Sequence, residues 1–177
     1  MSVSITDRVT TALPDPRRYF LLAAAASAAL LGAALLFQYV GGLYPCVLCI
    51  YQRIPYALVI VLGLAGYFAS RGSDTPSPTA ILLAAACALA FLTDGGIAIF
   101  HVGVEQGWWS GTDGCVGGAI DTSSIEAMRD AILNAPAVRC DDVAWSMLGI
   151  SMAGWNALAA LGLAALSILT IRQWRRA

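Results

Sequence analysis

The stretch that decides the fold lies between residues 44 and 53 and reads Tyr44-Pro45-Cys46-Val47-Leu48-Cys49-Ile50-Tyr51-Gln52-Arg53. It places two cysteines three positions apart, followed by an arginine, at the point where an uncharged turn gives way to a long apolar run. A helix that begins here brings both thiols close to unsatisfied backbone N–H groups, which favour the thiolate. Because the thiolate is the species that exchanges disulfides, this stretch predicts a redox site at the start of a helix.

The apolar run after Cys49 is one of four in the chain. The 177 residues are 59% hydrophobic and 12% charged, a composition outside the range of soluble globular domains. A helix needs about 20 apolar residues to cross a bilayer. Such windows occur at residues 19–40, 49–70, 79–100 and 146–171. We therefore predict an all-α membrane protein in which residues 1–177 form a single domain, a four-transmembrane-helix bundle.

The arginines indicate how this bundle is oriented. All ten basic residues are arginines, and seven lie at the termini or in the loop after the second span: Arg8, Arg17, Arg18, Arg71, Arg172, Arg175 and Arg176. By the positive-inside rule, both termini and this loop are predicted to be cytoplasmic. The loops at 41–48 and 101–145 then face the outer compartment, together with four of the five cysteines. The net charge of −1 gives no reason to expect a nucleic-acid partner.

The second outer loop is long enough that internal structure is expected. Its segment Ser123-Ser124-Ile125-Glu126 fits a capping box, and the apolar residues at 125, 128 and 132 share one face of a helix that would start there. Pro136 closes the segment. We predict a short amphipathic helix that lies on the outer leaflet.

Cys115 and Cys140 lie in this loop, 25 residues apart. Taken alone, they are best explained by a disulfide that staples the loop. A CxxC pair on the same side of the membrane offers a second disulfide for exchange, which favours redox chemistry. A zinc site built from the four outer cysteines is the metal alternative; it lacks a second close pair, so we predict no metal. Cys87, in the middle of the third span, is expected to be a packing residue.

Three further residues within the spans or at their outer ends are candidates for chemistry or need a partner. Arg53 is one turn into the second span, where an unpaired charge is costly. It either reaches the lipid headgroups or lines a pocket for the polar head of a lipid-soluble cofactor. His101, the only histidine, ends the third span and is a candidate proton or hydrogen-bond donor. Asp94 lies about two turns below it, and a pair with Arg53 across the spans is one alternative.

The residues from Pro45 to Arg53 resemble the P-C-x-L-C-x-x-[QE]-R signature of the bacterial disulfide bond formation protein B family, DsbB. Four spans, a second cysteine pair in the outer loop and a histidine at the end of the third span are also similar to this family. The stretches from His101 to Glu105 with Trp108-Trp109, and Cys140-Asp141 with Gly149 to Asn156, resemble its shorter members. The resemblance extends from about residue 19 to residue 171.

This resemblance implies an enzyme of the bacterial inner membrane with its cysteine pairs in the periplasm. The implied enzyme is a thiol:quinone oxidoreductase that reoxidises a periplasmic DsbA-like thiol oxidase and passes the electrons to ubiquinone or menaquinone. A partner poised near about −120 mV is itself a strong oxidant, so a high-potential acceptor such as a quinone is needed to regenerate it.

The resemblance also implies which residues carry out the reaction. Four are the exchanging cysteines and three lie at the quinone: Cys46, Cys49, Cys115 and Cys140, then Arg53, His101 and Glu105. By analogy, the partner's reduced cysteine attacks Cys115, and the freed Cys140 attacks the other disulfide at Cys46. Cys49 is then released as a thiolate that faces the quinone, and Arg53 polarises a quinone carbonyl.

Two other functions are compatible with the same features. A quinone reductase of the vitamin K type also passes electrons from thiols to a quinone, although the arginine directly after the CxxC motif favours the first interpretation. A non-enzymatic membrane scaffold or transporter subunit would keep both disulfides as structural crosslinks.

Overall fold

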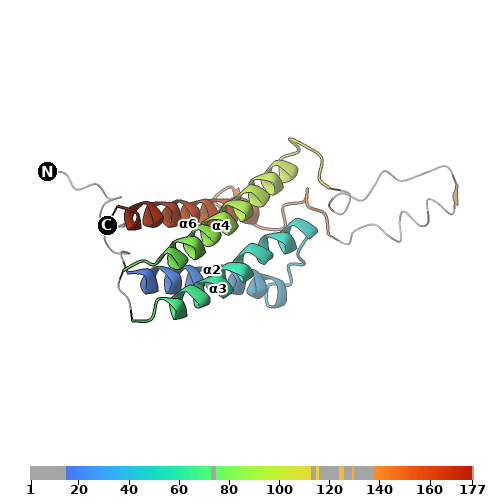
Figure 1. The fold of residues 1–177 in the computed structure, drawn as a ribbon. Helices are drawn as coiled ribbons and strands as arrows, with labels where there is room; N and C mark the ends of the chain where they lie inside the picture. Colours follow the sequence, from blue (N-terminus) through green and yellow to red (C-terminus); the bar gives the residue numbers. More distant parts are fainter. Residues whose placement is uncertain are drawn as a thin grey trace.

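The computed structural model describes residues 15–72, 75–112, 115, 124–125, 129 and 138–176. Within these residues, four long helices form one bundle (Figure 1): α2 (Pro16–Tyr39), α3 (Val47–Ala69), α4 (Pro78–Glu105) and α6 (Met152–Trp174). A short antiparallel hairpin of β1 (Ser146–Met147) and β2 (Ile150–Ser151) precedes α6. All four helices are long and apolar enough to cross a membrane. The predicted all-α, four-span membrane fold is confirmed.

Each helix begins where a side chain caps its first turn. The side chains of Asp15, Ser77 and Ser151 each accept a hydrogen bond from a backbone N–H of the helix that follows. Cys46 takes this place at the start of α3, where its sulfur accepts a hydrogen bond from the N–H of Cys49 at 3.3 Å. The first cysteine of the CxxC motif is therefore fixed by the helix that it caps.

The helices pack in the order α2, α3, α4 and α6, each against the next. At Gly63 of α3 the approach to α2 is so close that a Cβ atom would lie 2.9 Å from the Cβ of Ala24 and 2.9 Å from the carbonyl oxygen of Phe20. Small residues permit such contacts between helices in lipid. Large apolar side chains point away from the bundle: Leu21, Leu22, Leu36, Val61, Leu82, Leu89 and Leu158. These outward side chains suit a lipid environment.

Two helix boundaries differ from those predicted. Helix α4 continues to Glu105, because buried Val104 extends its apolar face beyond residue 100, so His101 lies within the helix and not in the loop. Helix α6 begins at Met152, since residues 146–151 form the hairpin, whose turn places Leu148 and Gly149 at φ of 55° and 79°. The amphipathic helix predicted between residues 123 and 136 lies outside the residues that the structure describes, apart from a few isolated positions.

Candidate active site

The CxxC motif lies at the end of the bundle where α3 begins and α4 ends. The sulfurs of Cys46 and Cys49 are 3.0 Å apart, and both residues are free thiols in this structure. Cys46 is buried, with 5% of its surface exposed, whereas Cys49 is partly exposed. The motif thus forms a dithiol at a helix start, where thiolates are favoured.

The second cysteine pair forms a disulfide between Cys115 and Cys140, with the Cα atoms 4.9 Å apart. Both cysteines are fully buried. The backbone also ties them together, since the N–H of Cys140 donates to the carbonyl oxygen of Cys115 at 3.1 Å. Beside them, Arg139 and Asp141 form an exposed, two-pronged ion pair, and the hydrogen bond from Arg139 lowers the pKa of Asp141. This pair of charges lies next to the cysteine that faces the CxxC motif.

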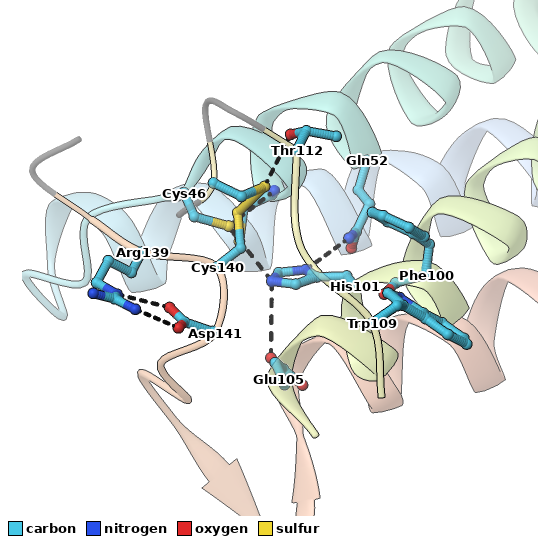
Figure 2. The surroundings of a disulfide bond; sticks show 12 residues. Cys46, Gln52, Phe100, His101, Glu105, Trp109, Thr112, Arg139, Cys140 and Asp141 are labelled. Carbon is cyan, nitrogen blue, oxygen red and sulfur yellow. Dashed lines mark hydrogen bonds and ion pairs between the residues drawn. A yellow bond between two sulfur atoms is a disulfide. The ribbon is translucent and has the colours of Figure 1, made fainter. Parts of the chain in front are cut away.

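The two cysteine pairs meet at His101. The sulfurs of Cys46 and Cys140 and the Nε2 atom of His101 all lie within 4.8 Å of one another, and all three residues are buried. Figure 2 shows the imidazole between the cysteines and Glu105, with Gln52 on its other side. Leu48 and Val104 pack around the sulfurs, so the contact excludes bulk water. This cluster brings the second disulfide within reach of Cys46 and not merely into the same compartment.

A metal could bind the sulfurs of Cys46 and Cys140 together with Nε2 of His101 only if the Cys115–Cys140 disulfide were first reduced. Cys140 is bonded to Cys115 in this structure and so offers no thiolate. Thiolate is the form in which cysteine binds metals. The expectation that the protein holds no metal stays a prediction.

The charge at this cluster is concentrated on Cys46, which precedes the first residue of α3. A hydrogen bond from the Cys49 thiol lowers the pKa of Cys46 to about 4; burial opposes this effect, and a hydrogen bond from His101 adds to it. The contact from His101 Nε2 to the Cys46 sulfur is 3.5 Å. In the reduced pair, this lowered pKa favours the thiolate on Cys46 and leaves the proton on Cys49.

A cavity of about 290 Å³ opens beside the CxxC motif. Leu30, Leu31 and Phe37 of α2 supply part of its apolar wall. Its polar lining includes all three residues predicted to bind the quinone together with the CxxC pair: Arg53, His101, Glu105, Cys46 and Cys49. A mostly apolar cavity with a few convergent polar groups is the form that small-molecule sites take.

Arg53 faces this cavity and is held by a neighbour on α2. Its Nη1 atom donates a hydrogen bond to Oε1 of Gln38 at 2.6 Å. The alternative in which Arg53 pairs with Asp94 is wrong, because the Asp94 carboxylate accepts instead from Asn156 at 3.0 Å. An uncharged partner leaves the charge of Arg53 available to a ligand.

Glu105 is the acid nearest to the imidazole. Its Oε1 atom lies 3.9 Å from Nε2 of His101, and its side chain is only 5% exposed. Its other oxygen, Oε2, is buried and has no hydrogen-bond partner among the described residues. A buried carboxylate oxygen with spare acceptor capacity at a cavity wall suits a ligand or a proton.

Several polar residues of the cavity wall were not predicted from the sequence. Gln52, Tyr56 and Asn156 all line the cavity, and the Tyr56 hydroxyl donates to Asn156 Oδ1 at 2.6 Å. Each is a polar side chain at membrane depth, which is itself a signal of function. Gln38 was missed as well, because a polar residue near a helix end is common at a membrane interface.

Comparison with known proteins agrees with this geometry. The family model described as disulfide bond formation protein DsbB matches residues 16–170. The chain is similar to Disulfide bond formation protein B of Methylococcus capsulatus, with 35% identity over 170 residues, covering 92% of this chain and 96% of that protein. It is also similar to the protein of the same name from Nitrosospira multiformis, with 32% identity, covering 91% and 96%. No solved structure gives a significant match.

The residues matched by the family model, 16–170, span both cysteine pairs of this chain and nearly all of its four helices. These similarities confirm the expectation of a membrane oxidoreductase that forms disulfides. By its sequence, its four spans and its two adjoining cysteine pairs, the chain belongs to the DsbB family of disulfide bond formation proteins.

Proposed function

We propose that this protein is a thiol:quinone oxidoreductase that reoxidises a DsbA-like dithiol oxidase and reduces a membrane quinone. The observation that carries the proposal is the contact between the two cysteine pairs at the wall of the cavity, where Cys46, Cys140 and His101 converge. A purely structural pair of disulfides has no need of a cavity beside one of them. Electron transfer to a lipid-soluble acceptor needs both features.

The proposed setting is the inner membrane of a bacterium, with residues 1–177 as one integral unit. The arginines near the termini and after α3 support a cytoplasmic location for both termini, by the positive-inside rule. The end of the bundle that carries the CxxC motif then faces the periplasm, where disulfides form. A soluble periplasmic partner can reach the second cysteine pair from that side.

The first half of the cycle moves the disulfide from the protein to its partner. A thiolate of the reduced partner attacks Cys115, which breaks the Cys115–Cys140 bond and releases Cys140 as a thiolate. The freed Cys140 attacks Cys46, which breaks the Cys46–Cys49 bond and releases the thiolate of Cys49. The partner's second thiolate then closes the partner's own disulfide and releases Cys115, so two electrons have moved to the protein.

The second half concentrates these electrons in the CxxC motif. Cys115 attacks Cys140 in the Cys46–Cys140 bond, re-forms the loop disulfide and releases Cys46. The result is a Cys46–Cys49 dithiol beside an intact Cys115–Cys140 disulfide, which is the combination that this structure holds. Its low pKa makes Cys46 a good leaving group in this step.

The quinone accepts two electrons and two protons from this dithiol. The cavity suits such a ligand, because its apolar wall matches a lipid-soluble ring and Arg53 is a charged donor at the CxxC end. His101 and Glu105 line the same space and are placed to hold or move a proton. These contacts apply equally to ubiquinone and menaquinone.

A coupled assay tests the function. Under anaerobic conditions, the protein in lipid nanodiscs is mixed with quinone and a reduced dithiol protein of the DsbA type. We expect one quinone reduced for each disulfide formed, because each transfer carries two electrons. Disulfide formation without quinone reduction, or neither of them in protein that is shown to be folded, would contradict the proposal and favour a structural role.

A further inference from the structure

A chain of hydrogen bonds runs from the middle of the bundle to the cysteine cluster. It begins at Asp94 of α4 and passes through Asn156 of α6 and Gln52 of α3 to His101. Asp94 is completely buried, and Gln52 and His101 are 7% and 4% exposed. The mechanism proposed above uses only the last residue of this chain. The donors and acceptors along this chain determine whether the His101 nitrogen that faces Cys46 carries a proton.

The carboxylate of Asp94 determines which end of the Asn156 amide faces it. Its Oδ2 atom accepts from Nδ2 of Asn156 at 3.0 Å. Because this carboxylate oxygen accepts the hydrogen bond, the neighbouring amide must present its NH₂ group and not its carbonyl oxygen. The Oδ1 atom of Asn156 points elsewhere and accepts from the hydroxyl of Tyr56 at 2.6 Å. Both ends of the Asn156 amide are thereby assigned.

The next two links follow from this assignment. The same NH₂ group of Asn156 donates to Oε1 of Gln52 at 2.8 Å. The Gln52 amide therefore turns its Nε2 atom toward His101, where it lies 3.0 Å from Nδ1. An amide nitrogen is a donor, so Nδ1 of His101 accepts and carries no proton.

A neutral imidazole holds one N–H, and with Nδ1 as acceptor that proton lies on Nε2. We propose that Asp94 and Asn156 are positioning residues that act through Gln52 to hold His101 in the tautomer protonated at Nε2, with this N–H directed at the Cys46 sulfur. Nε2 is 3.5 Å from that sulfur and 3.9 Å from Oε1 of Glu105, both of them acceptors. A ring nitrogen that carries a proton has no lone pair for a metal, so the same chain disfavours metal binding here.

The tautomer is a property of the fold, and its consequence for turnover rests on the proposed function. When Cys115 attacks Cys140, the Cys46–Cys140 bond breaks and its electron pair stays on Cys46. A donor already aimed at this sulfur stabilises the thiolate as it forms, without reorganisation of the site. Asp94 does not itself line the cavity, and its hydrogen bond goes to Asn156, through which it acts.

The single histidine of the chain permits a direct test. We label the full-length protein with ¹⁵N-histidine in nanodiscs and record its imidazole resonances at about pH 8, above the usual titration range of histidine. The expected spectrum shows a protonated Nε2 and an unprotonated Nδ1. The opposite spectrum in the unmodified protein overturns the inference, whatever the quinone assay gives.

Three variants test the chain of hydrogen bonds itself. Gln52→Glu keeps an acceptor toward Asn156 and places a second carboxylate oxygen at Nδ1, so we expect the proton to move to Nδ1. Asp94→Asn retains an acceptor for Asn156 and is expected to keep the tautomer of the unmodified protein. Asp94→Leu removes this acceptor and should give a mixture of the two His101 tautomers. Folded Asp94→Leu protein with an unchanged spectrum contradicts the role of Asp94; if this variant does not fold, Gln52→Glu decides.

A second measurement separates this role from mere packing. At about pH 8 the thiolate of Cys46 is fully formed, so its alkylation rate, followed by peptide mass spectrometry, reports the nucleophilicity of the sulfur, which falls when a hydrogen bond stabilises the thiolate. We expect Gln52→Glu and Asp94→Leu to raise this rate by about threefold, as for a roughly tenfold increase in thiolate basicity, and Asp94→Asn to leave it unchanged. Equal rates in all four proteins contradict the inference. The predicted tautomer in protein that reduces no quinone would instead overturn the proposed function alone.

Discussion

Serine in place of Cys49 is expected to lower quinone-dependent oxidation of a dithiol protein to the background rate. The Cys49 sulfur lies 3.0 Å from that of Cys46 and lines the cavity. A serine hydroxyl forms no disulfide, so the CxxC motif of this variant cannot alternate between a disulfide and a dithiol and cannot pass two electrons to the quinone. We expect a loss of about a thousandfold or more, measured as anaerobic quinone reduction in nanodiscs, as for removal of a catalytic nucleophile.

The chain offers a matched control for this loss. Cys87 is also buried in the bundle, and it packs in α4 against the apolar core near Phe91, away from the CxxC motif. Cys87→Ser is expected to retain quinone reduction, at a modest cost in stability from a hydroxyl in an apolar site. If Cys49→Ser turns over at the parent rate, or Cys87→Ser loses turnover while folded, the assignment of the redox pair is wrong.

Alanine in place of Arg53 is expected to weaken quinone reduction while leaving disulfide exchange intact. The guanidinium lines the cavity and is held by the uncharged Gln38, so its charge is not neutralised by the protein. Loss of a charged hydrogen bond to a ligand costs about 1.5–3 kcal/mol, which corresponds to a decrease of roughly ten- to a hundredfold in kcat/KM for quinone.

The separate steps make this prediction specific. In the proposed cycle the partner exchanges at Cys115 and Cys140, so stopped-flow oxidation of the reduced partner by Arg53→Ala protein should keep the parent rate in its first turnover. Arg71, which stacks over Phe68 at the other end of α3, supplies the control. Arg71→Ala is expected to reduce quinone normally. Equal losses in both steps, or in both variants, would show that Arg53 supports the fold and not the quinone.

Hydrophobic length and the CxxC motif were sufficient to predict the main features of the fold. Four apolar windows of spanning length predict four helices, because a helix satisfies its own backbone in lipid. The place of Cys46 at a helix start follows equally from the polar turn before it. Boundaries were less certain: α4 carries its apolar pattern past residue 100, and nothing in residues 146–151 predicts a hairpin instead of a helix.

The sequence was sufficient to predict which residues form the site, but not which of them contact one another. Charge or redox chemistry singled out the four outer cysteines, Arg53, His101 and Glu105, and the structure brings five of them to the cavity wall. The partner of Asp94 was not predictable, because it depends on which faces of α4 and α6 meet. Uncharged amides such as Gln52 and Asn156 attract little notice in a sequence, and only their distances show that they connect Asp94 to His101.

The proposed relay depends most on the contact between Cys46 and Cys140, and two double variants test this contact directly. Cys49→Ser/Cys115→Ser leaves Cys46 and Cys140, whereas Cys46→Ser/Cys115→Ser leaves Cys49 and Cys140. Both proteins are oxidised in nanodiscs with glutathione disulfide and mapped by mass spectrometry without reduction. The Cys46 and Cys140 sulfurs lie within 4.8 Å of each other beside His101. We therefore expect the Cys46–Cys140 crosslink of the first variant to form at least about tenfold faster than the Cys49–Cys140 crosslink of the second. Equal rates, or a faster crosslink through Cys49, would contradict the proposed relay.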